Sequence, residues 1–133
     1  MIPSVESCKE QAVPRAARIS GHVNVTKHSV PALKVAIKQH GPAVVLVDSS
    51  PRSFLYYSKG VLYDDRCSKK SSKHAVVTVG WGQERGEPYF ILKNSWSEAW
   101  GEGGYIRLQA RANTCGVLTH PSYPRLEDDD VLS

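Results

Sequence analysis

The chain has 133 residues, the size of a single domain, and 41% of them are hydrophobic, which is enough to build a packed core. Lys and Arg number 17 against 13 Asp and Glu, giving a net charge of +4, but the one basic group, Arg66, Lys69, Lys70 and Lys73, lacks the interleaved aromatic residues of a nucleic-acid-binding surface. The longest aliphatic run, Ala43–Val47, is too short to span a membrane, and the sequence MIPSVESCKE lacks the apolar core of a signal peptide. We therefore expect no nucleic-acid partner, no membrane partner and no signal peptide in this chain.

The two ends of the chain are predicted to differ from the region between them. Residues 1–28 contain prolines and little hydrophobic periodicity, so we expect an extended N-terminal segment with one strand at residues 22–26. Residues 127–133 begin with a run of acidic side chains and are predicted to form a solvated tail. The chain is therefore predicted to contain one domain, residues 1–126, which includes the N-terminal segment.

One helix is predicted at residues 31–40. Apolar side chains recur there at intervals of three and four residues, Ser29 can cap the first turn, and Gly41 and Pro42 end the helix. Residues 43–48 follow as a run rich in β-branched side chains without polar alternation. That pattern predicts a fully buried strand.

The second half of the chain is predicted to be rich in strands. A short strand near residues 61–63 lies within an aromatic-rich irregular stretch, and longer strands are expected at residues 75–81, 88–94 and 104–108. The glycine-containing sequence GQERGE joins the first two of these longer strands as a hairpin. The whole pattern predicts an α+β fold, with a mostly antiparallel sheet or barrel and one flanking helix.

This hairpin places two polar side chains opposite each other. If its centre lies near Glu84, paired residue numbers add up to about 168, so His74 faces Asn94 with their Cβ atoms about 5 Å apart. An amide oxygen that accepts from one ring N–H fixes the tautomer of an imidazole and leaves its other nitrogen free to exchange protons. The alternative is purely structural: a strand histidine with its polar atoms satisfied, and an asparagine that forms a turn.

The cysteines and one glycosylation motif indicate the compartment. Cys8, Cys67 and Cys115 are an odd number, so one lacks a partner within the chain, and none has the C-x-x-C spacing of a metal or redox site. The sequence Asn-Val-Thr at residues 24–26 is a sequon for N-linked glycosylation, which agrees with an oxidising, secretory setting. We expect no metal site and no cofactor.

Three motifs, in order along the chain, resemble the papain-like cysteine peptidases of the cathepsin L type. They are HAVVTVGWG at residues 74–82, YFILKNSWSEAWGEGGYIRL at residues 89–108 and CGVLTHPSYP at residues 115–124. The resemblance covers nearly the whole chain. It implies the C-terminal, right-hand domain of that fold, an antiparallel, β-barrel-like unit, with the left-hand helical domain missing.

The resemblance also implies roles for individual residues. His74 matches the general base and acid of the family, Asn94 the residue that orients it, and Trp96 the aromatic shield over the pair, although Trp96 can also be a core anchor. The implied chemistry is peptide hydrolysis through an acyl-enzyme, in which a thiolate beside an imidazolium attacks the carbonyl.

Three further residues match the main specificity pocket of the family: Leu46, Ala75 and His120. Because Leu46 fills space in that pocket, the resemblance implies a preference for an apolar substrate side chain. His120 would be an unusual floor, able to accept a polar or acidic group at low pH. The alternative for His120 is an ordinary surface position in the loop before Pro121.

The chain departs from the family in lacking the Gln…Cys-Trp segment that carries the nucleophile. Cys115 and Cys67 match the two halves of a family disulfide, and Cys8 matches a cysteine whose partner lies in the left-hand domain. Cys8 as a free nucleophile is disfavoured, because no Trp follows it. Lys73 stands where relatives usually have Asp or Asn, and a nearby cation disfavours an imidazolium at His74. The alternative is that the two side chains hardly interact, because neighbouring residues of a strand point to opposite faces.

These observations predict a cysteine-type peptidase by family, acting on peptide or protein substrates. Alone, the chain would be inactive, because it supplies only the His and Asn half of the active site. The resemblance implies a lysosomal or extracellular location, and a partner domain or chain that carries the nucleophilic cysteine and a mate for Cys8. The alternative is an inactive homologue that binds peptides or a protein.

Overall fold

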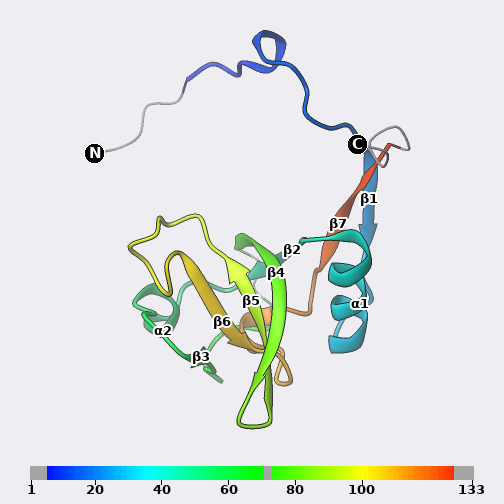
Figure 1. The fold of residues 1–133 in the computed structure, drawn as a ribbon. Coiled ribbons are helices and arrows are strands. Elements are labelled where there is room, and N and C mark those ends of the chain that lie inside the picture. Colours follow the sequence, from blue (N-terminus) through cyan, green and yellow to red (C-terminus); the bar gives the residue numbers. More distant parts are fainter. Residues whose placement is uncertain (1–5, 71–72, 128–133) are drawn as a thin grey trace.

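The computed structural model describes residues 6–70 and 73–127 (Figure 1). Within these residues, seven strands form one sheet in the order β1-β7-β2-β4-β5-β6-β3. Neighbouring strands are antiparallel, except for β3 and β6, which are parallel. The strands are β1 (Ile19–Asn24), β2 (Ala43–Val47), β3 (Val61–Leu62), β4 (His74–Glu84), β5 (Glu87–Lys93), β6 (Tyr105–Gln109) and β7 (Ser122–Leu126). The predicted α+β class with a mostly antiparallel sheet is confirmed.

The core is built from alternate side chains of the central strands. Because successive side chains of a strand point to opposite faces, every second residue of β2, β5 and β6 faces inward. The fully buried side chains of these strands are Ala43, Val45, Val47, Phe90, Leu92, Ile106 and Leu108. They give the strands that carry the candidate site a rigid apolar base.

Helix α1 (Val30–His40) is confirmed close to its predicted bounds. The hydroxyl oxygen of Ser29 accepts a hydrogen bond from the backbone N–H of Ala32 at 3.1 Å, which caps the first turn. At the other end Gly41 has a φ of 87°, a backbone conformation that glycine adopts without steric cost. The helix buries Leu33, Ala36 and Ile37. In Figure 1, α1 lies beside β1, β7 and β2.

Two elements were not predicted. A second, short helix, α2 (Arg52–Leu55), lies in the stretch expected to be irregular and is present in addition to the predicted flanking helix; in Figure 1 it lies beside β3 and β6. Strand β7 was also missed. Its residues show no buried alternation and include Pro124, which lacks a backbone N–H. β7 exists because it pairs with β1, a contact between distant parts of the chain.

The hairpin of β4 and β5 has a different register from the predicted one. Its turn is Arg85 and Gly86, both with positive φ, so it is a two-residue turn of the type that suits twisted strands. Glu84 pairs with Glu87, and a register shift between Thr78 and Gly80 changes the pairing further along. The numbers of paired residues therefore add up to 171 near the turn and to 170 at the end of the hairpin far from the turn, instead of the predicted 168. The centre assumed at Glu84 was wrong by more than one residue.

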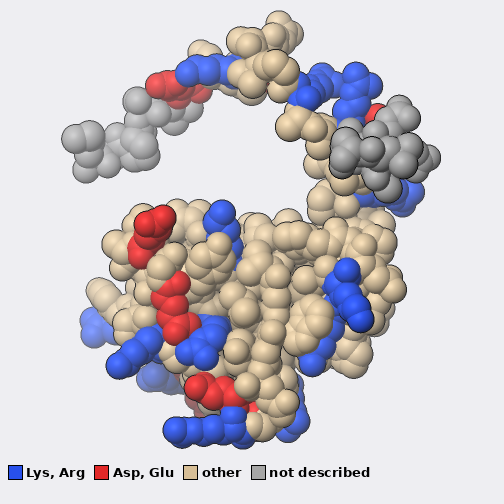
Figure 2. Space-filling view, viewed as in Figure 1, with Lys and Arg blue, Asp and Glu red and all other residues tan. Residues whose placement is uncertain are grey.

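The described residues also contain two 3-10 turns, at Glu10–Ala12 and Thr114–Gly116. No helix in this part of the chain is long and apolar enough to cross a membrane. The side chains of residues 6–20 are all exposed, and Figure 1 shows this segment running away from the sheet as an arc. Figure 2 shows Lys and Arg dispersed over the visible face of the molecule and interspersed with Asp and Glu. That face carries no large patch of a single charge.

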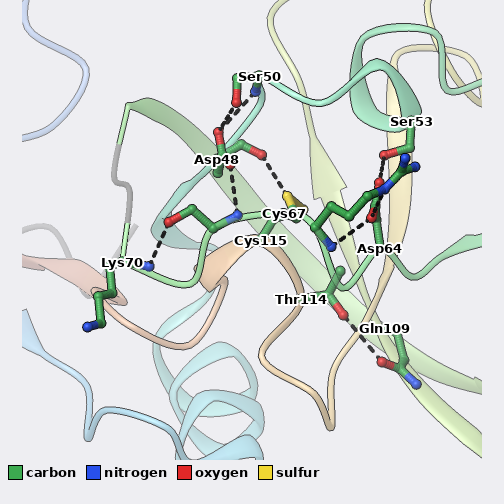
Figure 3. The surroundings of a disulfide bond; sticks show 11 residues. Asp48, Ser50, Ser53, Asp64, Cys67, Lys70, Gln109, Thr114 and Cys115 are labelled. Atoms are coloured by element: carbon green, nitrogen blue, oxygen red, sulfur yellow. Dashed lines mark hydrogen bonds and ion pairs between the residues drawn. A yellow bond between two sulfur atoms is a disulfide. The ribbon is translucent and has the colours of Figure 1, made fainter.

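A disulfide joins Cys67 to Cys115 across 48 residues of sequence (Figure 3). Two carboxylates hold the chain on either side of Cys67. Asp48 accepts hydrogen bonds from the Ser68 backbone N–H at 2.9 Å and from the Ser50 hydroxyl at 2.7 Å. The disulfide predicted from the family resemblance is present. The hydrogen bonds of Asp48 tie the loop that contains Cys67 to the end of β2.

Asp64, the other carboxylate, accepts from the Ser53 hydroxyl at 2.6 Å and from the Arg66 backbone N–H at 2.9 Å. These hydrogen bonds lower the pKa of Asp64 to about 2, the one from Ser53 contributing most. Burial acts to raise the pKa of Asp48, but the hydrogen bonds from Ser50 and Ser68 outweigh it and hold that pKa below its usual value. Both groups therefore stay ionised in a mildly acidic solution.

We predict that Asp64 makes folding stability depend on pH in the acid range. Its pKa is lower in the folded state, so its contribution to stability is complete above the unfolded pKa of about 4 and is lost as the pH falls towards 2. The measurement is the urea midpoint of unfolding from neutral pH to strong acid for the parent chain and for Asp64→Asn. The variant should show a shallower loss, whereas Asp65→Asn, at the exposed neighbour, should keep the parent slope. Equal slopes for all three proteins would contradict the prediction.

Candidate active site

His74 is the first residue of β4 and is paired with Val47 of β2. Val47 is fully buried, whereas the histidine is half-buried. This pairing fixes the backbone of His74 at the edge of the core while part of its ring stays open to solvent. A titratable side chain in such a place is held firmly yet can still exchange protons with a ligand.

Asn94 lies immediately after β5 and contacts the His74 ring. The side-chain oxygen Oδ1 of Asn94 lies 2.8 Å from Nε2 of His74, a hydrogen-bonding distance. The backbone N–H of Asn94 donates to the carbonyl oxygen of Gly104 at 3.0 Å, which closes the loop that follows. Since Val77 pairs with Lys93, Asn94 is diagonal to His74 rather than directly opposite it. The two predicted residues are brought together, but through a different register from the one assumed.

The hydrogen bonds of Asn94 determine the tautomer of His74. Oδ1 of Asn94 also accepts from the backbone N–H of Ser95 at 2.7 Å. A backbone N–H can only donate, so the atom facing it must be the amide oxygen, and Nε2 of His74 must in turn carry the proton that it donates. Nδ1 of the neutral ring is then left with its lone pair, ready to accept a proton.

Aromatic rings enclose the His74 ring. The Trp96 ring is stacked on it, with centroids 4.9 Å apart and planes 25° from parallel, and Phe54 meets it edge-on at 6.4 Å. Trp96 thus lies against one face of the His74 ring, and its role as a shield over the pair stays a prediction. Asn94 is buried, so its end of the hydrogen bond lies away from water, which strengthens the bond.

Phe54 is a site residue that the sequence analysis missed. It is fully buried in α2, and its ring packs against Trp96 at 5.6 Å and Trp100 at 5.5 Å between centroids. Trp100 donates from Nε1 to the carbonyl oxygen of Leu55 at 3.0 Å. The only sequence signal was the aromatic composition of residues 54–57, which does not predict a helix.

The loop after Asn94 is anchored by an ion pair. Glu102 accepts from Nε and Nη2 of Arg107 at 2.8 and 2.9 Å, and from the Tyr57 hydroxyl at 2.9 Å. Burial is the main cause that raises the pKa of Tyr57 to about 12, so it stays protonated and donates. Gly101, with a φ of 60°, has no room for a side chain, because a Cβ there would lie 2.6 Å from the carbonyl oxygen of Tyr105. The loop has one tightly fixed path.

The three residues assigned to the specificity pocket lie near one another along the sheet. Leu46 and Ala75 are direct cross-strand partners, half-buried and exposed respectively. β2 and β7 pair at Val44 and Ser122. Because these strands are antiparallel, Leu46, two residues after Val44, and His120, two residues before Ser122, lie on the same side of this pair. His120 is exposed. Its role as a pocket floor therefore stays a prediction.

Lys73 and Cys8 have surroundings that bear on the chemistry. Lys73 precedes β4 at the position opposite Asp48, and its charge is one of the causes that lower the pKa of Asp48. Lys73 therefore has an opposite charge in its surroundings, the Asp48 carboxylate at the end of β2. Cys8 is an exposed, free thiol in the N-terminal segment.

Comparison with known proteins defines the family. A sequence model described as papain family cysteine protease matches residues 3–125. The chain belongs to the papain family of cysteine proteases. It is similar to digestive cysteine proteinase 2 of Homarus americanus, with 41% identity over 119 residues, and to cathepsin K of Mus musculus, with 39% identity over 122 residues. These matches cover 89% and 91% of the chain but 37% of each relative, so the chain spans little more than a third of their length.

Solved structures agree with this assignment. A digestive procathepsin L 3 from the larval midgut of Tenebrio molitor has a TM-score of 0.77 and 38% identity, covering 81% of this chain and 36% of that one. The bromelain protease of Ananas comosus, in complex with the E64 inhibitor, has a TM-score of 0.80 and 35% identity over 92% of this chain and 57% of that one. The chain therefore has the fold of the right-hand domain of this family.

We predict that Asn94 alone selects the tautomer of His74. In Asn94→Ala, Nε2 loses its acceptor, so the neutral ring should become a mixture of tautomers, seen as intermediate ¹⁵N chemical shifts for both ring nitrogens. The control is Ser97→Gly, which lies in the same loop at a φ of 75° that glycine adopts easily. It should keep the parent shifts, with His74→Gln providing the assignment. Parent shifts in Asn94→Ala would contradict the prediction.

Proposed function

We propose that this chain supplies the His and Asn half of a cysteine peptidase active site. His74 is the general base and acid, and Asn94 orients its ring. The observation that carries the proposal is the hydrogen bond of 2.8 Å between Nε2 of His74 and Oδ1 of Asn94. Because the Ser95 N–H fixes the amide, this bond leaves Nδ1 as the atom that would face a thiol.

The proposed mechanism moves two protons through His74, one in each half of the reaction. Nδ1 takes the proton of a cysteine thiol, and the resulting thiolate attacks the peptide carbonyl carbon to form a tetrahedral intermediate. The imidazolium gives the proton to the leaving amine nitrogen as the C–N bond breaks, which produces the acyl-enzyme. His74 then takes a proton from water, the hydroxide attacks the thioester carbonyl, and the thiolate leaves.

The thiol of this mechanism comes from outside the described domain. Cys67 and Cys115 form a disulfide, and Cys8 lies exposed in the segment that runs away from the sheet. We therefore propose that a left-hand domain, in the same protein or another chain, carries the nucleophile and a mate for Cys8. The chain alone is inactive in this proposal.

The proposal also covers the chemistry of the substrate and the compartment in which the protein works. Leu46 and Ala75 form the cross-strand pair next to that of Val47 and His74, and their apolar side chains favour an apolar side chain of a peptide substrate. The names of the relatives, a digestive proteinase and a cathepsin, support a protein that works outside the cell or in the lysosome. The disulfide agrees, because disulfides persist in oxidising compartments.

A second candidate function is peptide or protein binding without catalysis. It is favoured by apolar side chains that remain exposed next to the site: Tyr56 is 78% exposed and Leu55 is 43% exposed, at the end of α2. A contiguous exposed apolar patch marks a surface that contacts a partner, and these two side chains are neighbours in the sequence. The test below distinguishes this candidate from the peptidase.

We predict that His74 is required for turnover once a nucleophilic half is present. The protein to assay is a fusion in which the part of digestive cysteine proteinase 2 that precedes the matched region is joined to this chain. With a fluorogenic peptide, His74→Ala should lower kcat/KM about 10²- to 10⁴-fold, the usual contribution of a general base. The matched control is His22→Ala, an exposed histidine in β1, which should keep the parent value.

The chain by itself should give no turnover that a thiol-directed epoxide inhibits. Inhibitor-sensitive turnover by the chain alone would show that it carries its own nucleophile, against the proposal. Equal kcat/KM for the parent fusion and His74→Ala would remove His74 from the mechanism. A folded fusion that binds the peptide without cleaving it would favour the binding function instead.

A further inference from the structure

The sequon at residues 24–26 lies where the fold exposes it. Asn24 is the last residue of β1, which is an edge strand of the sheet, and a turn follows at residues 27–28. Asn24 and Thr26 are both exposed, whereas Val25 between them is 8% exposed and belongs to the core. The alternation of an extended chain thus puts the two residues that define the sequon on the solvent side together.

The surroundings of Asn24 leave room for a sugar. Its side chain makes no hydrogen bond within residues 6–70 and 73–127, so attaching a group to the amide nitrogen breaks no hydrogen bond of these residues. Asn24 borders two surface hollows, one shared with α1 through Val35 and one shared with His120 and Pro121. Val35 is 51% exposed, an apolar group that an attached sugar would partly cover.

The position of Asn24 is also compatible with an open catalytic cleft. Asn24 pairs with Ser122, Ser122 with Val44, and Val44 with Val77, so three strand spacings, about 14 Å, separate β1 from β4. His74 lies at the start of β4, three residues before Val77. A glycan on the edge strand can therefore extend away from the ring that the peptidase mechanism needs.

We propose that Asn24 is an N-linked glycosylation site. The modification needs the Asn-x-Thr sequon, an accessible asparagine and passage through the secretory pathway. The first two are properties of residues 24–26. The third is supported by the disulfide between Cys67 and Cys115, which forms in the same oxidising compartments. The proposal does not depend on the chemistry of His74.

The test is expression of the full chain behind a secretion signal in eukaryotic cells. The chain should migrate more slowly than its calculated mass predicts, and peptide-N-glycosidase should remove the shift and convert Asn24 to Asp, as read by peptide mass spectrometry. The shift should be lost in Asn24→Gln and in Thr26→Val. It should be kept in Thr26→Ser, which retains the hydroxyl of the sequon.

An appended sequon at the C-terminus reports entry into the secretory pathway, whether the chain is secreted or retained. If that added site is glycosylated while Asn24 stays unmodified, the proposal is overturned. A glycosidase-sensitive shift that persists in Asn24→Gln without the appended site overturns it as well. Neither result bears on peptidase activity, because the readout is mass alone.

Discussion

The candidate site depends on one amide oxygen, Oδ1 of Asn94. It accepts from the backbone N–H of Ser95 and from the ring of His74, so the backbone orients the amide and the amide orients the imidazole. Asn94 is 8% exposed, and a hydrogen bond removed from water is both stronger and harder to replace. An asparagine free to rotate could present its NH₂ group instead, which would favour the opposite tautomer. The Ser95 N–H excludes that arrangement.

This amide is held in place by the loop that follows it. Asn94 and Gly104 close the loop at its base, and Glu102 binds both Arg107 of β6 and the hydroxyl of Tyr57. An Arg–carboxylate pair with two parallel hydrogen bonds fixes direction as well as distance. Between these anchors the loop presents Trp96 to the His74 ring. The ion pair at Glu102 therefore helps to hold the loop that carries Trp96.

A second set of contacts comes from α2. Phe54 is fully buried and touches the rings of His74, Trp96 and Trp100, so it joins β4 to the loop after β5. A phenylalanine in this place has no chemistry of its own. Its contribution is packing: removing a large buried ring leaves a cavity that the neighbouring rings would move to fill.

Local signals in the sequence predicted the elements whose stability is local. Helix α1 has its cap, its apolar stripe and its terminating glycine within the segment from Ser29 to Gly41, and it was predicted closely. β7 has no such signal, because its partner β1 lies about a hundred residues away in sequence, and pairing of that kind leaves no local pattern. The short helix α2 depends on burying Phe54 under the tryptophans, which no window of residues can show.

The contact between His74 and Asn94 was predicted despite the wrong register. The assumed pairing sum of 168 and the observed sum of 170 at Val77 and Lys93 differ by two residues. Because side chains of a strand alternate with a period of two, this error keeps the side chains at this end of the hairpin, beyond the register shift, on their correct faces. A diagonal neighbour is also within reach of a long side chain. An error of one residue would have placed Asn94 on the opposite face of the sheet.

The geometry of His74 is set entirely by contacts within this chain: Val47 fixes its backbone, Asn94 its tautomer, and Trp96 and Phe54 its ring plane. The half of the site that carries His74, the proposed general base, is therefore preorganised before any nucleophile approaches. In a complete peptidase, the remaining freedom lies in how a cysteine-bearing domain docks against this one. A thiol must come within hydrogen-bonding reach of Nδ1, so an error of about 1 Å in docking would cost far more rate than a similar error in a surface loop. Selection for activity would therefore act on the interface between the two halves.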